Sequence, residues 1–390
     1  MDSLETLGLL SQYSSLEEDQ PGQNSCAIAQ SCSAIYSESE KEMRIPEVTR
    51  ARSAAGDVKL LKTVLTTACE RNCNYCAFRA GRDFRRATLP AEEMARIFHQ
   101  MYIAGIVEGL FLSSGVAGGG IRTQDRLIDT AEILRRKYAY RGYLHLKIMP
   151  GAEKDQVLRA MQLATRVSVN LEAPNPARLI DLAPRKNFIN ELMRPLSWVE
   201  EIRSKLINSN RYDRRWPSLA TQFVVGSVGE SDLELLQTSE HLFNKVGLTR
   251  IYYSKFTPIR GTPFENLPPE KLLRQNRLYQ AAFLLRSYGY TYEEFDFTQN
   301  GNLPLDVDPK LAWARANLSA TPVEVNKAES SLLLRIPGFG PKGVKAILET
   351  RSKHPIKEIG DLKRLGINPR RAVEYILING KPPDGQISLW

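Results

Sequence analysis

The chain has 390 residues, enough for one large enzyme domain and a small additional domain. Its apolar fraction of 42% and its charged fraction of 25% are ordinary for a soluble globular protein. No apolar run is long enough to form a membrane-spanning helix. The first residues lack the basic segment and apolar stretch of a signal peptide, so we expect a cytoplasmic protein with no membrane partner.

The net charge of +9 is unevenly distributed along the chain. Between Asn326 and Trp390 there are 12 Lys and Arg against 6 Asp and Glu, so two thirds of the excess lies in the last sixth of the chain. This distribution predicts a polyanionic partner, DNA or another nucleic acid, although a solvated basic face would have the same composition.

Residues 1–56 are rich in Ser, Glu, Gln and Gly with little periodicity, so we expect a poorly ordered N-terminal arm. Residues 57–300 then alternate short β-rich runs with longer helical patterns. The expected strands are Lys59–Thr66, Gly109–Ser113, Tyr143–Ile148, Arg166–Leu171, Leu219–Val225 and Arg250–Phe256. The expected helices are Ala91–Ala104, Gln124–Lys137, Glu153–Ala164, Phe188–Lys205, Ser231–Val246 and Glu270–Tyr288.

Most of these strand candidates are continuous apolar or β-branched runs, which is typical of strands buried on both faces. Strands that alternate with helices predict an α/β fold with a parallel sheet and right-handed crossovers. Six such units are too few for a closed eight-stranded barrel. We therefore expect a partial (βα)6 TIM-like barrel with its functional site at the C-terminal ends of the strands.

Three cysteines lie close together just after the first expected strand. Cys69, Cys73 and Cys76 form a C-x3-C-x2-C pattern, whereas Cys26 and Cys32 lie in the expected arm and are interpreted as ordinary thiols. An odd number of cysteines, three of them clustered, indicates metal binding and not a disulfide framework. Three thiolates can ligate three irons of an iron–sulfur cubane and leave the fourth iron without a protein ligand. A structural zinc site is the alternative, but the closest histidine, His99, falls on an expected helix.

With the aromatic Tyr75 before its last cysteine, this pattern resembles the signature of the radical S-adenosylmethionine (radical SAM) superfamily. The resemblance implies a [4Fe–4S] cluster on the three cysteines, with an open iron that chelates the amino and carboxylate groups of S-adenosylmethionine (SAM). It also implies that an electron from a low-potential donor such as flavodoxin or ferredoxin cleaves SAM reductively and yields a 5′-deoxyadenosyl radical.

The same resemblance implies SAM-binding positions at further strand ends. Ser113-Ser114-Gly115 stands in place of the family's Gly-Gly-Glu motif, and the missing glutamate leaves the SAM amino group to backbone carbonyls or serine hydroxyls. Each position also suits an ordinary structural role, such as a turn glycine. The expected cofactor-binding residues are Tyr75, Ser113, Ser114, Gly115, Ser168, Asn170, Glu172, Gly226, Tyr253 and Ser254.

Other polar residues of the core are less specific candidates. The segment from Arg79 to Asp83 follows the cysteines and could reach a SAM carboxylate or a substrate phosphate. His145 and Lys147 alternate on the third strand and therefore point the same way. Lys147 is either functional or paired with Glu172 in a buried ion pair. The sequence identifies no catalytic residue.

A Pro- and Asn-containing linker and connector, residues 301–321, leads to a module of residues 322–390. There an apolar helix, the turn Pro337-Gly338-Phe339-Gly340 and a second helix resemble a helix-hairpin-helix motif. Such a turn presents backbone N–H groups and a helix N-terminus to a DNA phosphate. The expected nucleic-acid-binding residues are Gly338, Gly340, Lys342 and Lys345.

A second, degenerate copy from residue 361 to 378, with Gly366 as its hairpin glycine, predicts a compact all-α module of four helices. The alternative is that the hairpins only pack against neighbours or bind protein.

Taken together, residues 58–390 resemble a bacterial family of radical SAM proteins assigned to DNA modification or repair, which carry a C-terminal helix-hairpin-helix. We therefore expect an enzyme that delivers a carbon radical to DNA or another nucleic acid. One alternative is an iron–sulfur nucleic-acid-binding or redox-sensing protein without turnover. An iron–sulfur DNA glycosylase would place four cysteines after the hairpin, but no cysteine follows Cys76. A methylthiotransferase would need a second cluster, for which Cys26 and Cys32 are too few.

Overall fold

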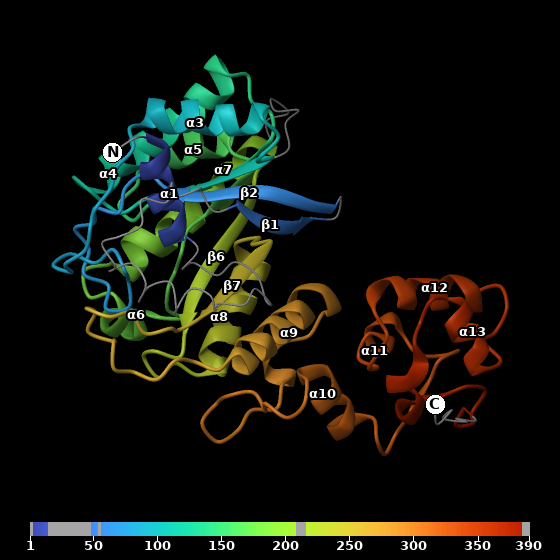
Figure 1. The fold of residues 1–390 in the computed structure, drawn as a ribbon. Helices are drawn as coiled ribbons and strands as arrows, with labels where there is room; N and C mark the ends of the chain where they lie inside the picture. The colour runs from blue at the N-terminus through green and yellow to red at the C-terminus, as the bar shows by residue number, and fades with distance from the viewer. Residues whose placement is uncertain (1–2, 15–47, 54–55, 208–215, 384–390) are drawn as a thin grey trace, which may run out of the picture. The chain divides into compact units, whose positions relative to one another are not determined.

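The computed structural model describes residues 3–14, 48–53, 56–207 and 216–383. Its contacts divide these residues into two compact units. The first unit comprises residues within Met1–Glu230 and His241–Lys271, and the second comprises residues within Ser231–Glu240 and Leu272–Trp390. Each unit is described by itself (Figure 1).

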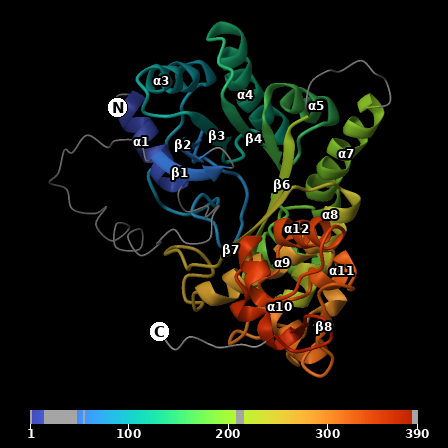
Figure 2. The same cartoon turned by 90° about the vertical axis from the view of Figure 1, so that its right-hand side faces the viewer.

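The first unit is built on a seven-stranded sheet whose strands follow one another in chain order (Figure 2). The last six strands are parallel, and the first pairs antiparallel with the second. The strands are β1 (Val48–Ser53), β2 (Gly56–Val64), β3 (Gly109–Ser113), β4 (Tyr143–Lys147), β5 (Arg166–Ser168), β6 (Ser218–Val225) and β7 (Arg250–Lys255). Since β1 and β7 are not paired with each other, the sheet is an open, curled partial barrel. The six expected parallel strands and their order are confirmed, whereas β1 was not expected.

Helices connect the parallel strands, and α1 begins the first unit. They are α1 (Ser3–Ser14), α3 (Ala91–Ile103), α4 (Gly120–Glu132), α5 (Lys154–Leu163), α6 (Pro176–Leu182) and α7 (Arg194–Ile207), with α8 (Asp232–Lys245) shared between the two units. Local sequence fixes several of their starts: Asn175 accepts a hydrogen bond from the Arg178 N–H, and Glu153 forms a capping box with Gln156. Among the described parts of the chain, no helix has the length and apolar character that crossing a membrane requires.

The N-terminal residues are more structured than expected. In α1, Leu7 and Leu10 are fully buried, and the helix packs on β2. The expectation of a poorly ordered arm is therefore wrong for Ser3–Ser14 and Val48–Ser53. The apolar residues of α1 are buried against the sheet, a tertiary effect that composition alone does not reveal. Residues 15–47, with Cys26 and Cys32, lie outside the described residues.

The sheet has two chemically different faces, because successive side chains of a strand point to opposite sides. One face carries buried apolar residues such as Leu110, Leu144 and Phe223. The cross-strand register places the other set of alternate residues together on what we call the polar face. The polar face carries Lys62, Phe111, His145, Lys147, Arg166, Ser168, Gln222, Arg250, Tyr252 and Ser254. Asn170, just beyond β5, donates to Gln222 of this face, whereas Glu172 lies in register with Phe223.

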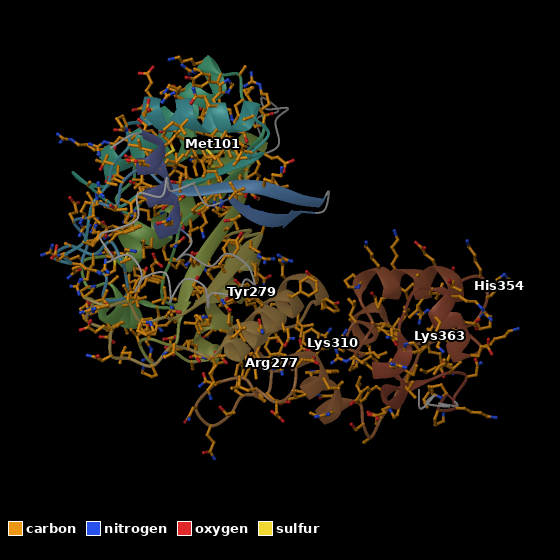
Figure 3. The ribbon with its side chains drawn as sticks, viewed as in Figure 1. Met101, Arg277, Tyr279, Lys310, His354 and Lys363 are labelled. Atoms are coloured by element: carbon orange, nitrogen blue, oxygen red, sulfur yellow. The ribbon has the colours of Figure 1, made fainter. Side chains whose placement is uncertain are left out.

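The second unit contains α9 (Leu272–Tyr288), α10 (Pro309–Asn317) and a small C-terminal module. The module has three short helices and a two-stranded parallel sheet: α11 (Ser330–Leu333), α12 (Pro341–Arg351), α13 (Ile359–Arg364), β8 (Val323–Glu324) and β9 (Ile376–Leu377). Its core includes Leu333, Ile336, Phe339 and Ile347, all nearly fully buried. Figure 3 shows His354 at the outer margin of this module, and it labels Lys310, which lies in the first turn of α10.

The expectation of a four-helix module is wrong, because residues 370–378 do not form a helix. They form two 3-10 turns, Pro369–Arg371 and Val373–Tyr375, followed by β9. The β-branched Ile376 and Ile378 favour extended backbone, and pairing of β9 with β8 satisfies backbone groups that a helix would have paired internally.

One arginine of the module binds the segment that follows α9. Arg335 forms a two-pronged ion pair with Glu294, with two nitrogen–oxygen distances of 2.9 Å, and donates to the carbonyl oxygen of Gly289 at 2.9 Å. Its guanidinium also lies over the rings of Tyr290 (4.5 Å) and Trp313 (5.8 Å). The side chains of Arg335 and Glu294 are only 14% and 24% exposed, so water competes little for this pair.

We predict that Arg335→Met lowers the free energy of unfolding by about 2–4 kcal/mol, because Glu294 and the Gly289 carbonyl then lose a charged donor. Urea unfolding followed by circular dichroism measures the change. Arg364→Met is the matched control, since Arg364 is 71% exposed and its pairs with Asp361 and Glu358 should contribute at most about 1 kcal/mol. Equal effects of the two substitutions would contradict the role given to Arg335.

Candidate active site at the cysteine loop

The three clustered cysteines lie on the loop between β2 and α3, which we call the cysteine loop (residues 65–90). It begins at the C-terminal end of the first parallel strand, where functional residues gather in such sheets. Little of this loop is regular secondary structure, apart from a bridge between Thr66 and Thr88. Its shape therefore depends on hydrogen bonds from side chains and from neighbouring segments.

Arg86 fixes the loop from within. Its guanidinium donates to the carbonyl oxygens of Thr67 (2.6 Å), Phe78 (2.8 Å), Arg79 (2.8 Å) and Arg82 (3.3 Å). Arginine suits this task because its planar group carries five donors in a fixed arrangement. These bonds join both ends of the segment that contains the cysteines.

The loop also lies directly against the end of β3. Gly115 donates its N–H to the Thr66 carbonyl at 2.8 Å, and a Cβ atom at Gly115 would lie 2.3 Å from the Ala68 carbonyl oxygen. The Glu70 N–H then donates to Val116 at 2.8 Å. The backbone of the cysteine loop approaches residue 115 so closely that only glycine fits there. The glycine is therefore explained by packing, whether or not a ligand binds.

A third set of contacts attaches the loop to residues 181–191. Arg71 pairs with Glu191 at 2.5 Å and donates to the Arg185 carbonyl at 2.6 Å. The Asn74 N–H donates to the Leu182 carbonyl at 2.8 Å. These contacts join segments more than a hundred residues apart in sequence, so Arg71 and its partners could not be identified from local sequence pattern.

The three thiols share one electrostatic environment. Burial raises the pKa of Cys73, and burial together with the neighbouring Cys73 raises the pKa of Cys76 to about 12. The charge of Cys69 contributes to both shifts in the same direction. The Cys76 sulfur accepts a hydrogen bond from the Phe78 N–H at 3.4 Å, which stabilises its thiolate form.

A buried ion pair lies beside the thiols. Lys186 pairs with Glu172 at 2.9 Å, and the two side chains are only 9% and 5% exposed. Burial opposes the positive charge of Lys186, but the charges of Cys73 and Glu172 outweigh burial and raise the Lys186 pKa. Burial and a hydrogen bond with Glu172 raise the pKa of Tyr75 well above its ordinary value. One cluster is therefore formed by Glu172, Lys186, Tyr75 and Cys73. The buried ion pair considered between Lys147 and Glu172 is not the one observed, because Glu172 pairs with Lys186.

Glu172 has two unusual features. Its backbone has φ of +66°, a left-handed conformation that favours glycine or asparagine. Its Oε2 atom is buried and accepts no hydrogen bond within the described residues. A buried carboxylate oxygen without a donor is costly, and strained backbone is common where proteins bind ligands. Both features favour Glu172 as a ligand-binding residue.

Polar side chains on or just beyond the four strands β4 to β7 form hydrogen bonds with one another on the polar face. Asn170 donates to Gln222 at 3.2 Å, and Gln222 donates to Ser254 at 2.8 Å. Ser168 shares a hydrogen bond of 2.8 Å with His145 Nε2. All five residues are at least nine-tenths buried. Gln222 was not among the residues expected from the sequence. It is a polar residue inside the apolar run of β6, which is the pattern that identified Ser168, Asn170 and Glu172.

The remaining expected cofactor-binding residues divide between the two faces. Ser113 lies in register with Val64 on the polar face, and Ser114 donates to the Gly115 carbonyl at 2.8 Å. Ser254 belongs to the polar face, whereas the fully buried side chain of Tyr253 packs against Phe223 on the opposite face. We therefore leave the Tyr253 side chain out of the candidate site.

The turn after β6 is held by its own side chains. Gly226 has φ of +98°, and a Cβ atom there would lie 2.4 Å from a Glu270 carboxylate oxygen. The Gly226 N–H donates to Glu230, and the Val228 carbonyl accepts from Arg178 at 3.0 Å. Ser227, in the same turn, has a buried hydroxyl without a partner among the described residues. The glycine is thus explained by packing, and Ser227 is the residue of this turn with an unused polar atom.

In the second unit, the expected hairpin residues lie at the start of α12. Gly338 has φ of +87°, and a Cβ atom there would lie 3.1 Å from the Asn368 carbonyl oxygen. Gly340 is the residue before the helix, and Lys342 lies exposed in its first turn. The exposed Lys345 ammonium lies 3.7 Å from Glu349, so part of its charge is compensated.

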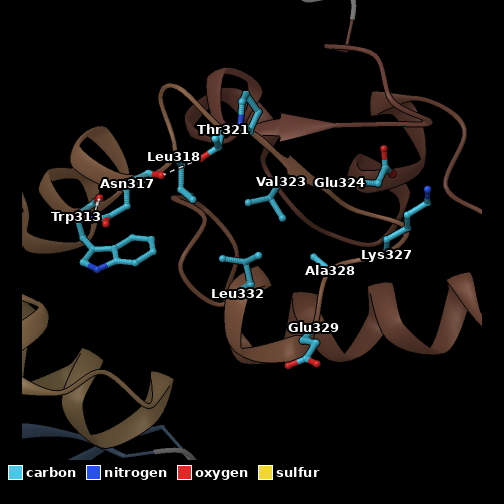
Figure 4. A pocket seen from close by; sticks show the side chains of 11 residues that line it. Trp313, Asn317, Leu318, Thr321, Val323, Glu324, Lys327, Ala328, Glu329 and Leu332 are labelled. Atoms are coloured by element: carbon cyan, nitrogen blue, oxygen red, sulfur yellow. Dashed lines mark hydrogen bonds between the residues drawn. The ribbon is translucent and has the colours of Figure 1, made fainter.

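A shallow surface hollow is present elsewhere in the second unit (Figure 4). Trp313, Leu318, Val323 and Leu332 supply apolar lining, and Glu324, Lys327 and Glu329 supply charged groups. The Glu324 carboxylate accepts hydrogen bonds from the backbone of Asn326 (3.0 Å) and Gly380 (2.7 Å), so it has a structural role. The residues that line this hollow include no histidine or cysteine, and they form no recognisable catalytic set.

The donor set of the cysteine loop suits an iron–sulfur cluster. The pKa values of Cys73 and Cys76 are raised, and such thiols become good ligands when bound iron supplies positive charge. Lys186 and the Phe78 N–H further stabilise negative sulfur. Within the described residues, no three His, Cys, Asp or Glu side chains lie close enough to hold a single metal ion. His99, the histidine considered for zinc, instead stacks on Tyr138 with ring centroids 4.3 Å apart.

We predict that Gly115→Ala lowers the free energy of unfolding by about 1–3 kcal/mol, because the new methyl group must displace the backbone of the cysteine loop. Thermal unfolding of the metal-free protein measures this change. Gly360→Ala is the control, since the atom it meets is the flexible end of Glu358 and alanine is favoured within α13. If Gly115→Ala leaves the free energy of unfolding unchanged, the loop is not packed on β3 in this way.

One comparison with known proteins assigns part of the chain to a superfamily. Residues 63–238, which run from β2 into α8, match the radical SAM superfamily. No curated protein is significantly similar to the whole sequence.

Several solved structures resemble the chain in part. They include the [FeFe]-hydrogenase maturase HydG from Carboxydothermus hydrogenoformans (17% identity, TM-score 0.45, covering 58% of this chain and 51% of HydG). Methylornithine synthase PylB has 12% identity and a TM-score of 0.43, covering 57% of this chain and 60% of PylB. A radical SAM methyltransferase from Sphaerobacter thermophilus has 13% identity and a TM-score of 0.42, covering 71% of this chain and 85% of the methyltransferase.

The chain thus spans about half to 60% of the length of the maturase and the synthase. From the family match, residues 63–238 form a radical SAM domain, and members of this superfamily use a [4Fe–4S] cluster and S-adenosylmethionine.

Proposed function

We propose that Cys69, Cys73 and Cys76 hold the cluster, and that the enzyme directs its radical chemistry at DNA or another nucleic acid, in modification or repair. The observation that carries the cluster assignment is the group of three electrostatically coupled thiols beside Lys186 and Glu172. The bound cluster and SAM together supply a 5′-deoxyadenosyl radical, with the electron from a low-potential donor such as flavodoxin or ferredoxin.

The residues around the thiols have separate roles in this proposal. Lys186 offsets the negative charge of the bound cluster, and the Phe78 N–H donates to the Cys76 sulfur. Tyr75 and Lys186 hold the Glu172 carboxylate in place. The free Oε2 atom of Glu172 then accepts a hydrogen bond from SAM, whose hydroxyl and ammonium groups are both suitable donors.

The polar face supplies the rest of the SAM site in this proposal. Ser168, Asn170 and Ser254 orient SAM through hydroxyl and amide groups, and Gln222 fixes Asn170 and Ser254 relative to each other. Backbone atoms of the segments at Gly115 and Gly226, with the hydroxyls of Ser113 and Ser114, take the place of a missing acidic residue. Because these groups are buried, they also keep water away from the reacting atoms.

The nucleic-acid target rests on the C-terminal module. Gly338 and Gly340 shape the hairpin that precedes α12, and the first turn of that helix carries Lys342. This arrangement suits a backbone phosphate, which contacts the helix N-terminus without being read for its sequence. The last 65 residues hold two thirds of the net positive charge, which supports the same partner. The alternative is an iron–sulfur nucleic-acid-binding or redox-sensing protein without turnover.

Anaerobically reconstituted protein should release 5′-deoxyadenosine from SAM in the presence of dithionite, as measured by liquid chromatography. Replacing Cys69, Cys73 or Cys76 by alanine should abolish both this release and binding of the cluster's iron, because each thiolate holds a different iron. The double variant Cys26→Ser and Cys32→Ser is the control and should keep its iron. An intact cluster without SAM cleavage would favour the sensing alternative.

Replacing Lys342 and Lys345 together by alanine should weaken binding of duplex DNA and reduce the slope of log Kd against log salt by about one to two. Fluorescence anisotropy at several salt concentrations measures both quantities. Arg122 and Arg126, exposed on α4, give a charge-matched double alanine control that should bind as the wild type does. Identical behaviour of both double variants would show that the module docks on something other than DNA.

A further inference from the structure

The part of the cysteine loop that follows the last cysteine, residues 79–86, carries four arginines. Two of them are fixed by backbone carbonyl groups. Arg86 donates to the four carbonyl oxygens described above, and Arg82 donates to those of Arg260 (2.9 Å) and Ala77 (3.1 Å). Residues 79–86 are therefore held in a defined shape although they form no helix or strand.

A fifth arginine lies next to this segment through Arg71. The Ala80 N–H donates to the Arg71 carbonyl at 2.7 Å, and the Arg71 guanidinium donates to the Arg185 carbonyl at 2.6 Å. The exposed Arg185 guanidinium donates in turn to the Glu70 carbonyl at 3.3 Å. Residues 79–81 and Arg185 thus lie against the same residue of the cysteine loop, although they are far apart in sequence.

The positive charge of these arginines is not neutralised by neighbouring carboxylates. Arg82, Arg86 and Arg185 donate to carbonyl oxygens, and among the residues that the structure describes none of the three forms an ion pair. A carbonyl group stabilises a guanidinium but does not cancel its charge. Residues 79–86 and 180–189 together contain five Arg against two Asp and no Glu, so this part of the surface attracts anionic partners.

Two exposed aliphatic side chains lie on either side of Arg185 in the sequence. Ile180 is 63% exposed and Ile189 is 56% exposed. The Asn74 side chain donates to the Asp181 carbonyl at 2.8 Å, so Ile180 adjoins the cysteine loop. Isoleucine gains from burial against another protein but offers nothing to the phosphates of a nucleic acid. Arginines beside apolar side chains are typical of a protein–protein interface.

We propose that residues 79–86, with Ile180, Arg185 and Ile189, form a docking surface for an acidic one-electron carrier protein that reduces the cluster. Opposite charges bring the two proteins together faster and orient them. The surface adjoins the thiols, because the Arg79 N–H donates to the Cys76 carbonyl at 3.2 Å. An electron that enters here has a short path to the three cysteines. This inference rests on the proposed function, since it requires the cluster on those cysteines.

The electron transfer balances without any chemistry at the docking surface. One electron leaves the fully reduced flavin of a flavodoxin, which keeps its second electron, and the oxidised cluster gains the electron that is lost. No bond forms or breaks in this step. The docking surface therefore affects how fast the two proteins associate, whereas the cluster and SAM supply the chemistry that follows.

The test is the rate at which a fully reduced, acidic flavodoxin reduces the cluster of the full chain, followed anaerobically by stopped-flow absorbance without SAM. Dithionite, a small reductant that needs no docking, is the comparison. In Arg79→Gln with Arg185→Gln, the second-order rate constant with flavodoxin should fall about tenfold, since both guanidinium charges are lost. The rate constant with dithionite should stay within about twofold of the wild-type value.

Two further variants separate charge and apolar contact from general effects. Arg136→Gln with Arg141→Gln removes the same charge from exposed residues just before β4, at the opposite end of the parallel strands, and should react as the wild type does. Ile180→Ser with Ile189→Ser should slow the reaction with flavodoxin but not that with dithionite. Added salt should slow the wild type more than the Arg79 and Arg185 variant, because salt screens the attraction.

Equal rates with flavodoxin for the wild type and the Arg79 and Arg185 variant would overturn the proposal. An equal loss with dithionite would overturn it too, because the arginines would then support the cluster itself. A variant that reacts normally with flavodoxin but binds duplex DNA more weakly would assign the surface to a nucleic acid, which also contradicts the proposal.

Failure of the proposed function gives a different result. If the chain binds no iron, the cluster assignment is wrong, and iron analysis shows this before any reductant is added. Binding of the flavodoxin to the metal-free chain, measured by isothermal titration calorimetry, then still tests the docking surface. Loss of binding in the Arg79 and Arg185 variant would support the docking surface, and unchanged binding would contradict it.

Discussion

The cysteine loop has almost no regular secondary structure, so a single side chain carries much of its geometry. The Arg86 guanidinium bonds to four carbonyl oxygens on both sides of the cysteines, and no atom of these bonds belongs to a cysteine. The loop therefore holds its shape without metal ligation. Contacts with Gly115 and with residues 181–191 then fix this preformed loop to the end of β3 and to the C-terminal end of α6 with the residues that follow it. The placement of the thiols follows from these bonds.

The sheet contributes the second half of the site through its parallel order. Because β2 to β7 all run in the same direction, their C-terminal ends meet at one edge, and the alternation of side chains gives that edge one polar and one apolar face. The apolar face stabilises the domain by burial, which leaves the polar face available for hydrogen bonds to ligands. Glu172 and Lys186 lie where the polar face meets the cysteine loop, so their ion pair connects the two halves.

The strand order, the partial barrel and the cysteine motif were accessible from the sequence, since each depends on local pattern or spacing. Lys186 and Arg71 were not, because their roles depend on partners brought together only by folding. Gln222 could have been found from its alternation with apolar neighbours. Tyr253 and Ser254 were both expected to bind the cofactor, but adjacent strand residues point to opposite faces, and Tyr253 packs on Phe223. The absent final helix of the C-terminal module reflects pairing of β9 with β8, a tertiary contact that overrode the hairpin pattern.

The left-handed backbone of Glu172 has a consequence for how this sequence can vary. A glycine at this position would relieve strain of order 1 kcal/mol and would also remove a buried carboxylate oxygen that lacks a donor. The same glycine would leave Lys186 buried without its counter-charge, which costs more than the strain that is relieved. Position 172 therefore keeps a carboxylate for the ion pair, although its backbone conformation and its second oxygen are both costly. Such a balance is typical of a residue kept for activity and not for stability alone.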